Sequence, residues 1–122
     1  MKSVFVRKAL DFQVREIPVP PLGAFDVLVR VKACGLCGTD VRIAMEAEEH
    51  QPIGHEVAGV VEAVGSAVQN VVPGQDVCLE SGTFDRFSTL SRDGKVELDK
   101  TGRSMFNSGV GTMGFAEFMV VP

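Results

Sequence analysis

Apolar and polar side chains alternate along several short stretches of the chain. Residues 4–6, 12–14 and 27–33 place an apolar side chain at every second position, and a period of two predicts β-strands. Residues 56–64 form an apolar run that is rich in β-branched side chains and is interrupted by Gly59. This pattern predicts a buried strand with a bulge or a close backbone approach at the glycine.

Turn-forming residues separate the predicted strands. Pro18–Gly23 is rich in proline, which has no amide hydrogen for a central strand, so this segment is expected to be a connector. Residues 72–76 predict a turn into a short strand at 77–80. Residues 92–95 hold an Asp-Gly pair at their centre, which predicts a two-residue β-hairpin. Residues 115–121 predict the last strand.

One short helix is expected at residues 39–46. It starts with Thr39 and Asp40, and a hydroxyl and an acid both suit a helix N-terminus. Short strands separated by Gly and Pro, with one such helix, predict an all-β barrel or sandwich. The chain has 122 residues, and a domain has roughly 100–200, so residues 1–122 are expected to form one domain.

Composition and charge exclude several classes of partner. Twelve Lys and Arg residues stand against sixteen Asp and Glu, which leaves a net charge of −4. Since no basic stripe could neutralise a row of phosphates, nucleic acid is not an expected partner. No apolar run approaches the roughly 20 residues that span a bilayer, and the N-terminus lacks a long apolar segment. We therefore expect no membrane insertion and a cytoplasmic location.

The cysteines offer the first candidate chemistry. Cys34 and Cys37 have the CxxC spacing of a zinc knuckle or of a thiol redox pair. A knuckle needs a second pair of ligands, and the other candidates, Cys78, His50 and His55, form no such pair. Both thiols could equally pack in the core, because a free cysteine behaves as a small hydrophobe.

A histidine and an acid follow farther along the chain. His55 and Glu56 directly precede the apolar run, and a histidine there could simply be hydrogen-bonded at a strand entrance. Asp40 strengthens the functional interpretation, because a ligating histidine often donates its second ring N–H to a carboxylate. Adjacent residues of a strand point to opposite sides, so His55 and Glu56 converge only if the backbone turns at Gly54. With a cysteine thiolate these residues would form half of a catalytic zinc site.

Three segments in a fixed order carry a family resemblance. VLVRVKACGLCGTDVRI at 27–43, PIGHEVAGVVEAVGSAVQNVVPGQDV at 52–77 and GFAEFMVVP at 114–122 resemble the N-terminal, GroES-like catalytic domain of the zinc-dependent medium-chain alcohol dehydrogenases. The resemblance implies a mainly β fold, a GroES-like partly open β-barrel with one or two short helices. It also implies NAD(P)-dependent oxidation of a small alcohol or reduction of an aldehyde in a full-length parent enzyme.

The resemblance assigns a role to each candidate residue. It implies that Cys37 and His55 bind the catalytic zinc and that Glu56 is an occasional alternative ligand. It implies that Asp40 orients His55 from behind, and that the Thr39 hydroxyl passes on the alcohol proton.

Departures from the family pattern limit what this chain is expected to do alone. No cysteine follows Cys78, so a structural zinc lobe is not expected. Arg42 stands where many members have a proton-relaying histidine, and a guanidinium is not a base. Cys34 is not a ligand in the family pattern. The family's remaining strong zinc ligand and its nucleotide-binding domain lie beyond these 122 residues, so we expect weak zinc binding and folding without the metal.

Two further patterns are interpreted as structural. Residues 109–114 match GxGxxG, but a dinucleotide loop must open a helix and meet an acid about 20 residues later. Only eight residues follow, so a glycine-rich turn is expected, without NAD(P) binding by this chain. Residues 46–49 are mostly acidic and are expected to be a solvated face.

Two other functions and one association remain open at this stage. The chain could be a non-enzymatic binding or assembly module that keeps a relic of the zinc site, or a thiol redox protein that uses Cys34 and Cys37. In the family one flank of the barrel packs against the nucleotide-binding domain. A bare apolar flank is seldom tolerated in a monomer, so we expect a homodimer or weaker association through it.

Overall fold

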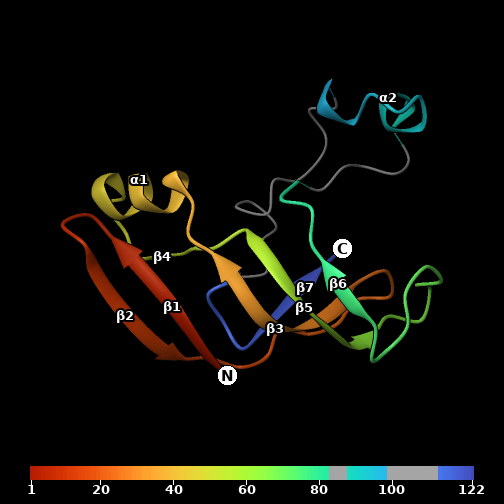
Figure 1. Cartoon of the computed structure of the whole chain (residues 1–122), viewed down its shortest axis with the longest axis horizontal. Helices are drawn as coiled ribbons and strands as arrows, with labels where there is room; N and C mark the ends of the chain where they lie inside the picture. The colour runs from red at the N-terminus through yellow and green to blue at the C-terminus, as the bar shows by residue number, and fades with distance from the viewer. Residues whose placement is uncertain (83–87, 99–112) are drawn as a thin grey trace.

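The computed structural model describes residues 1–82, 88–98 and 113–122, and within them strands predominate (Figure 1). The elements in chain order are β1 Lys2–Arg7, β2 Asp11–Glu16, β3 Val27–Gly35, α1 Gly38–Glu46, β4 Gln51–Pro52, β5 Glu56–Val64, β6 Asp76–Cys78, α2 Thr89–Arg92, a 3-10 turn Val96–Leu98 and β7 Phe118–Val121. The expected strands at 4–6, 12–14, 27–33 and 56–64 and the helix at 39–46 are confirmed. Among the described residues, no helix is long and apolar enough to cross a membrane.

The strands form two antiparallel sheets that are joined by one segment. The first sheet has the order β2-β1-β4 and the second has the order β6-β5-β3-β7. Phe115 accepts a 2.8 Å hydrogen bond from the Val4 amide, and Glu117 accepts one of 3.1 Å from the Val31 amide. The segment before β7 therefore ties both sheets together. The result is the expected partly open, mainly β fold with two short helices (Figure 1).

Two clusters of apolar side chains hold these elements. Val57 of β5, Met119 of β7 and Met113 pack together, with Val31 of β3 against them. Val6 of β1 packs against Ala44 of α1 and against Ile53. The second cluster fixes α1 against the first sheet, and α1 is the helix that begins at the candidate site.

Gly59 confirms the expected close approach within β5. The register of β3 and β5 shifts between Val31 and Ala33, and a Cβ at Gly59 would collide with the carbonyl oxygen of Arg30. The turn at 72–76 is also confirmed, since the Gln75 amide donates to the Val72 carbonyl at 3.2 Å. Gly74 supplies the positive φ of 90° that this turn requires.

The β-hairpin predicted at residues 92–95 is wrong. Ser88 caps the N-terminus of α2, and Asp93 is its C-cap. Gly94 has a φ of 74°. The Gly94 amide donates to the Ser91 carbonyl, and the Lys95 amide donates to the Leu90 carbonyl. This pair of hydrogen bonds defines a Schellman motif. The Asp-Gly pair therefore ends a helix instead of joining two strands.

Other expectations are adjusted in detail. The last strand is shorter than predicted, because β7 covers only Phe118–Val121, and the strand at 77–80 is displaced to Asp76–Cys78. The acidic run is confirmed as a solvated face, with Glu46, Glu48 and Glu49 exposed. Of the GxGxxG segment at 109–114, the structure describes only Met113 and Gly114.

The tip of the β1–β2 hairpin is strained. Ala9 and Leu10 have φ values of 64° and 57°, in the left-handed region that costs a non-glycine residue about 1–2 kcal/mol. The Leu10 side chain is 59% exposed. We expect Leu10→Gly to raise the free energy of unfolding by about 0.5–1 kcal/mol, after the larger unfolded-state entropy of glycine is subtracted.

Thermal unfolding followed by far-UV circular dichroism tests this expectation, because the chain has no Trp or Tyr. Val14→Gly is the matched control, since Val14 is an exposed residue of the adjacent strand β2. Glycine weakens a strand, so the control should be less stable than the wild type. A loss of stability in Leu10→Gly would contradict the assignment of strain.

Candidate metal centre

Cys37 lies at the N-terminus of α1, two residues after β3 ends at Gly35. Its backbone is extended, with φ −97° and ψ 159°, which is typical of an N-cap residue. Asp40, the third residue of the helix, reaches back and accepts a hydrogen bond from the Cys37 amide to Oδ2 at 3.0 Å. The helix start therefore fixes the backbone that carries the thiol.

His55 and Glu56 lie where the chain enters β5. Gly54 has a φ of 96°, so the backbone turns directly before His55, and β5 begins only at Glu56. The two side chains can then converge although they are neighbours in sequence. The ligand atoms of Cys37, His55 and Glu56 all lie within 4.8 Å of one another, so the structure brings these three predicted residues together.

Asp40 connects the two segments that carry these donors. The carboxylate is buried, with only 1% of the residue exposed. Its Oδ1 accepts a 2.9 Å hydrogen bond from the Gly54 amide and lies 3.7 Å from Nδ1 of His55. One carboxylate thus holds the helix start, the Gly54 turn and one side of the imidazole ring.

Thr39 lies next to the Cys37 sulfur. The Cys37 thiol donates to its hydroxyl oxygen at 3.8 Å, and the side chain is half-buried. Arg42, one turn farther along α1, is exposed. The structure therefore places the Thr39 hydroxyl, and not the Arg42 guanidinium, next to a donor atom.

The other cysteines occupy different surroundings. A Cβ on Gly54 or on Gly114 would lie 2.7 Å from the Cys34 sulfur, so this thiol fills the space beside both glycines. Burial raises the pKa of the Cys34 thiol above its ordinary value, whereas a reactive redox thiol needs a lowered pKa. This observation argues against Cys34 as a redox nucleophile. Cys78 is exposed.

A cleft of about 390 Å³ opens beside the cluster. It is lined by His55 and Glu56 and, across the sheet, by Cys78, Glu80 and Ser81.

His50 takes no part in the site, because its Nε2 lies 3.4 Å from Asp11 near the β1–β2 hairpin. The hydrogen bond from Arg7 lowers the pKa of the Asp11 carboxyl below its ordinary value.

Two features of the centre are not evident from the sequence. Gly35 leaves the space that the Glu56 carboxylate occupies, since a Cβ there would collide with its oxygen. The hydrogen bond that the Gly54 amide donates to the Asp40 carboxylate could not be derived from the motif, because the two residues are 14 positions apart. Gly35, inside the CxxC motif, was the sequence signal of this close packing.

Residues 23–122 match the family of the alcohol dehydrogenase GroES-like domain, and the chain belongs to this family. An L-threonine 3-dehydrogenase from Anaeromyxobacter sp. (strain Fw109-5) is 37% identical over 119 residues, which are 91% of this chain and 34% of that protein. The resemblance stated from the sequence motifs is therefore confirmed.

Solved structures agree with this assignment. Alcohol dehydrogenase TADH from Thermus sp. ATN1 superposes with a TM-score of 0.86 at 28% identity, over 100% of this chain and 37% of that chain. A dehydrogenase from Sinorhizobium meliloti 1021, described as zinc-binding and solved with NADP, gives a TM-score of 0.79 at 31% identity, over 99% and 36%. The chain thus spans about a third of the length of these relatives.

Proposed function

We propose that this chain is the zinc- and substrate-binding domain of an NAD(P)-dependent alcohol dehydrogenase or aldehyde reductase. Its substrate would be a small alcohol or aldehyde. The nicotinamide cofactor would be bound by a part of the enzyme outside these 122 residues. The relatives support this proposal, since one of them is described as a zinc-binding dehydrogenase and was solved with NADP.

The convergence of Cys37, His55 and Glu56 within 4.8 Å carries the proposal. A thiolate, an imidazole and a carboxylate are donors that zinc accepts, and a catalytic site uses three protein ligands and an open position. The two anionic donors would balance a divalent charge. Asp40 faces Nδ1 of His55, so the metal would use Nε2, as expected for a histidine oriented by a carboxylate.

The residues of the chain divide the proposed chemistry between them. Zinc bound here would supply a Lewis acid that lowers the pKa of a substrate alcohol. The Thr39 hydroxyl, next to the Cys37 sulfur, can accept the alcohol proton and donate its own onward. The open cleft beside His55 and Glu56 leaves room for the substrate. Asp40 takes no proton in this scheme and acts by positioning.

Cobalt titration tests the donor set, because Co²⁺ occupies zinc sites and thiolate ligation gives a charge-transfer absorption band. We expect a weak but saturable band in the wild type and its loss in Cys37→Ser. Cys34→Ser and Cys78→Ser are the matched controls and should keep the band. A band that survives Cys37→Ser, or disappears only in a control, would refute the assignment.

Cofactor binding is tested separately. We expect no saturable micromolar binding of NADH or NADPH to the 122-residue chain when nicotinamide fluorescence is followed. The same titration on any longer form of the protein should give saturable binding. Saturable binding by these 122 residues alone would place the nucleotide site within them and contradict the proposed division of labour.

Glu56 can be tested through its neighbour Gly35. A Cβ at Gly35 would displace the Glu56 carboxylate, so Gly35→Ala should weaken Co²⁺ binding by about tenfold, the scale seen when a ligand loses its support. Gly38→Ala is the matched control, since nothing lies within 4 Å of its Cβ position. Equal affinities in the two variants would remove Glu56 from the donor set.

A further inference from the structure

β2 lies at the edge of its sheet, and its apolar side chains are uncovered. Among the described strands it pairs only with β1 (Figure 1). Phe12 is 55% exposed and Val14 is 69% exposed. They alternate along the strand and therefore share one face. Their cross-strand partners on that face are Val6 and Val4.

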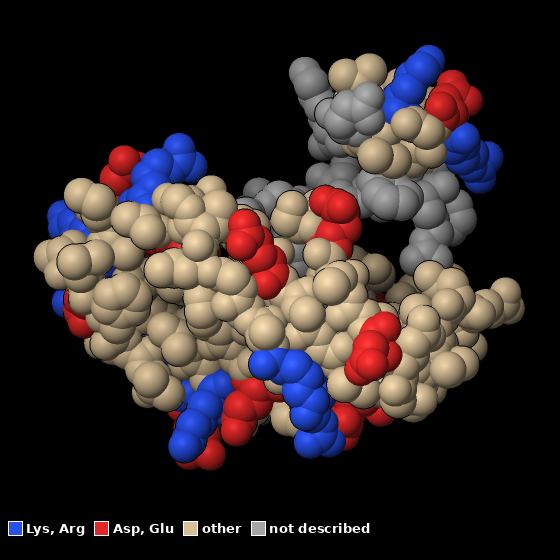
Figure 2. All heavy atoms as spheres, viewed as in Figure 1, with Lys and Arg blue, Asp and Glu red and all other residues tan. Residues whose placement is uncertain are grey.

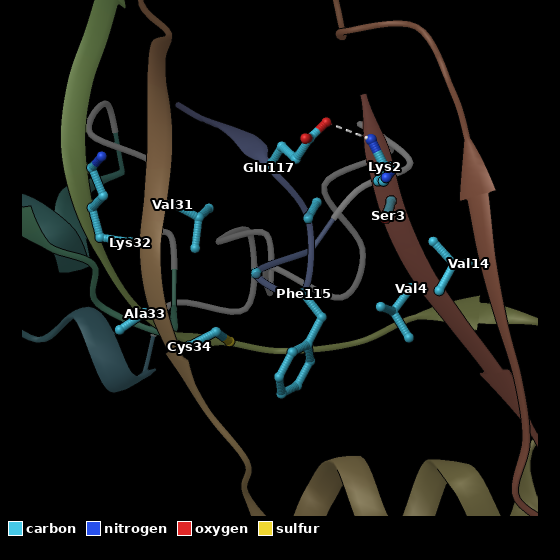
Figure 3. Close-up of a pocket in the computed structure, with 12 residues that line it drawn as sticks. Lys2, Ser3, Val4, Val14, Val31, Lys32, Ala33, Cys34, Phe115 and Glu117 are labelled. Atoms are coloured by element: carbon cyan, nitrogen blue, oxygen red, sulfur yellow. Dashed lines mark hydrogen bonds between the residues drawn. The ribbon is translucent and has the colours of Figure 1, made fainter.

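Val6 is buried beneath α1, whereas Val4 and Val14 continue this face into an open cleft between the two sheets. The cleft has a volume of about 400 Å³, and Figure 3 shows that Val4, Val14 and Phe115 contribute side chains to its wall, with Val31 on the opposite sheet. Residues other than Lys, Arg, Asp and Glu cover most of the face of the molecule in Figure 2. The apolar side chains of β2 are thus continuous with the apolar wall of this cleft.

β2 has only part of the protection that edge strands carry. Natural edges are kept apart by charged side chains, above all lysines, and by prolines, bulges or a short length. β2 has six residues, DFQVRE, of which Asp11, Arg15 and Glu16 are charged, but it contains no proline and no lysine. Its register with β1 runs without interruption from Asp11 to Glu16. The strand is therefore regular enough to pair with another strand.

We propose that a second copy of this chain pairs with β2 along its free edge. In an antiparallel two-fold arrangement centred on Gln13, Phe12 lies opposite the partner's Val14, and Asp11 lies opposite the partner's Arg15. Aromatic–aliphatic and opposite-charge pairs both stabilise neighbouring strands. A two-fold axis generates each pair twice. The two first sheets then form one continuous sheet across both copies.

The charges determine the register of this interface more than its strength. Asp11 already accepts a 2.7 Å hydrogen bond from Arg7, and Arg15 lies over the Phe5 ring at 4.6 Å. Exposed ion pairs contribute little to affinity, but a register shifted by two residues would place like charges near each other or leave both unpaired. The apolar pairs and the backbone hydrogen bonds supply the attraction. The association expected from the sequence involves the flank that packs against the nucleotide-binding domain in the family, and this proposal places it at the edge of β2 instead.

Sedimentation equilibrium of the 122-residue chain tests the association. We expect a reversible dimer whose dissociation constant rises at least tenfold in Val14→Lys. Val72→Lys is the matched control, because Val72 is 62% exposed in the β5–β6 turn and lies outside the proposed interface. A strict monomer at high concentration, or an equal effect of both variants, would overturn the proposal.

Cross-linking tests the register. Two copies of residue 13 would face each other across the axis, so Gln13→Cys in a Cys78→Ser background should form a disulfide-linked dimer under mild oxidation. Val72→Cys in the same background is the control and should cross-link only slowly. Far-UV circular dichroism of each variant shows that it is folded. Equal cross-linking rates would exclude this register and this surface.

Discussion

Replacing Gly54 by alanine should lower the free energy of unfolding by about 3–5 kcal/mol and displace His55 from the donor cluster. The φ of 96° strains any residue that has a Cβ. The new methyl would also lie 2.7 Å from the Cys34 sulfur, 2.7 Å from the Phe115 ring and 2.8 Å from the Phe115 amide. Neither the backbone amide nor the packed ring can move away cheaply. Urea unfolding followed by far-UV circular dichroism measures the loss.

Gly74→Ala separates the two causes of the expected loss in Gly54→Ala, which are backbone strain and steric crowding. Gly74 has nearly the same φ, 90°, but nothing lies within 4 Å of its Cβ position. Its substitution should therefore cost only the backbone strain, about 1–2 kcal/mol. If both variants lost the same stability, the crowding around Gly54 would contribute nothing and our account of the turn would be wrong.

Asp40→Ala is expected to cost about 3–5 kcal/mol even without metal, because it leaves the buried amide of Gly54 and the part-buried amide of Cys37 without their acceptor. Asp40→Asn keeps one oxygen acceptor and should cost less. Unfolding in the presence of a chelator isolates this structural effect.

Co²⁺ binding then measures the second role of Asp40, which is to position the His55 ring, apart from its contribution to stability. Both variants should also weaken Co²⁺ binding, since His55 loses the carboxylate beside Nδ1. Glu46→Ala, at the exposed end of α1, is the control and should change neither property. Unchanged stability in Asp40→Ala would show that water replaces the carboxylate at these amides.

The strands could be predicted because their signal is local. Alternation at 4–6, 12–14 and 27–33 reflects one buried face per strand, and the structure has strands at each place. The Asp-Gly pair at 93–94 does not distinguish two structures, because Asp-Gly is common in a tight hairpin turn and glycine is also common as the left-handed residue that ends a helix. The deciding signal was Ser88, which caps the preceding short helix.

The donor residues and the turn that brings them together could be named from the sequence, but the surroundings of that turn could not. The motifs of the family resemblance indicated Cys37, His55 and Glu56, and the sequence named Gly54 as the place where the backbone must turn. The space that Gly35 leaves for Glu56, and the packing of Gly54 against Cys34 and Phe115, join residues from different parts of the fold. Contacts across the fold leave no periodic trace in the sequence, so only the structure could supply them.

The segment before β7 has a consequence for how the chain folds. The carbonyl of Lys2 accepts a 3.1 Å hydrogen bond from the Glu117 amide, and the Lys2 amide donates to the Glu117 carboxylate at 2.7 Å, across 115 positions of sequence. Contacts of such long range close late and slow the folding of β-proteins. During synthesis, the hydrogen bonds between Lys2 and Glu117 therefore form only after residue 117 has left the ribosome, and the barrel closes only then.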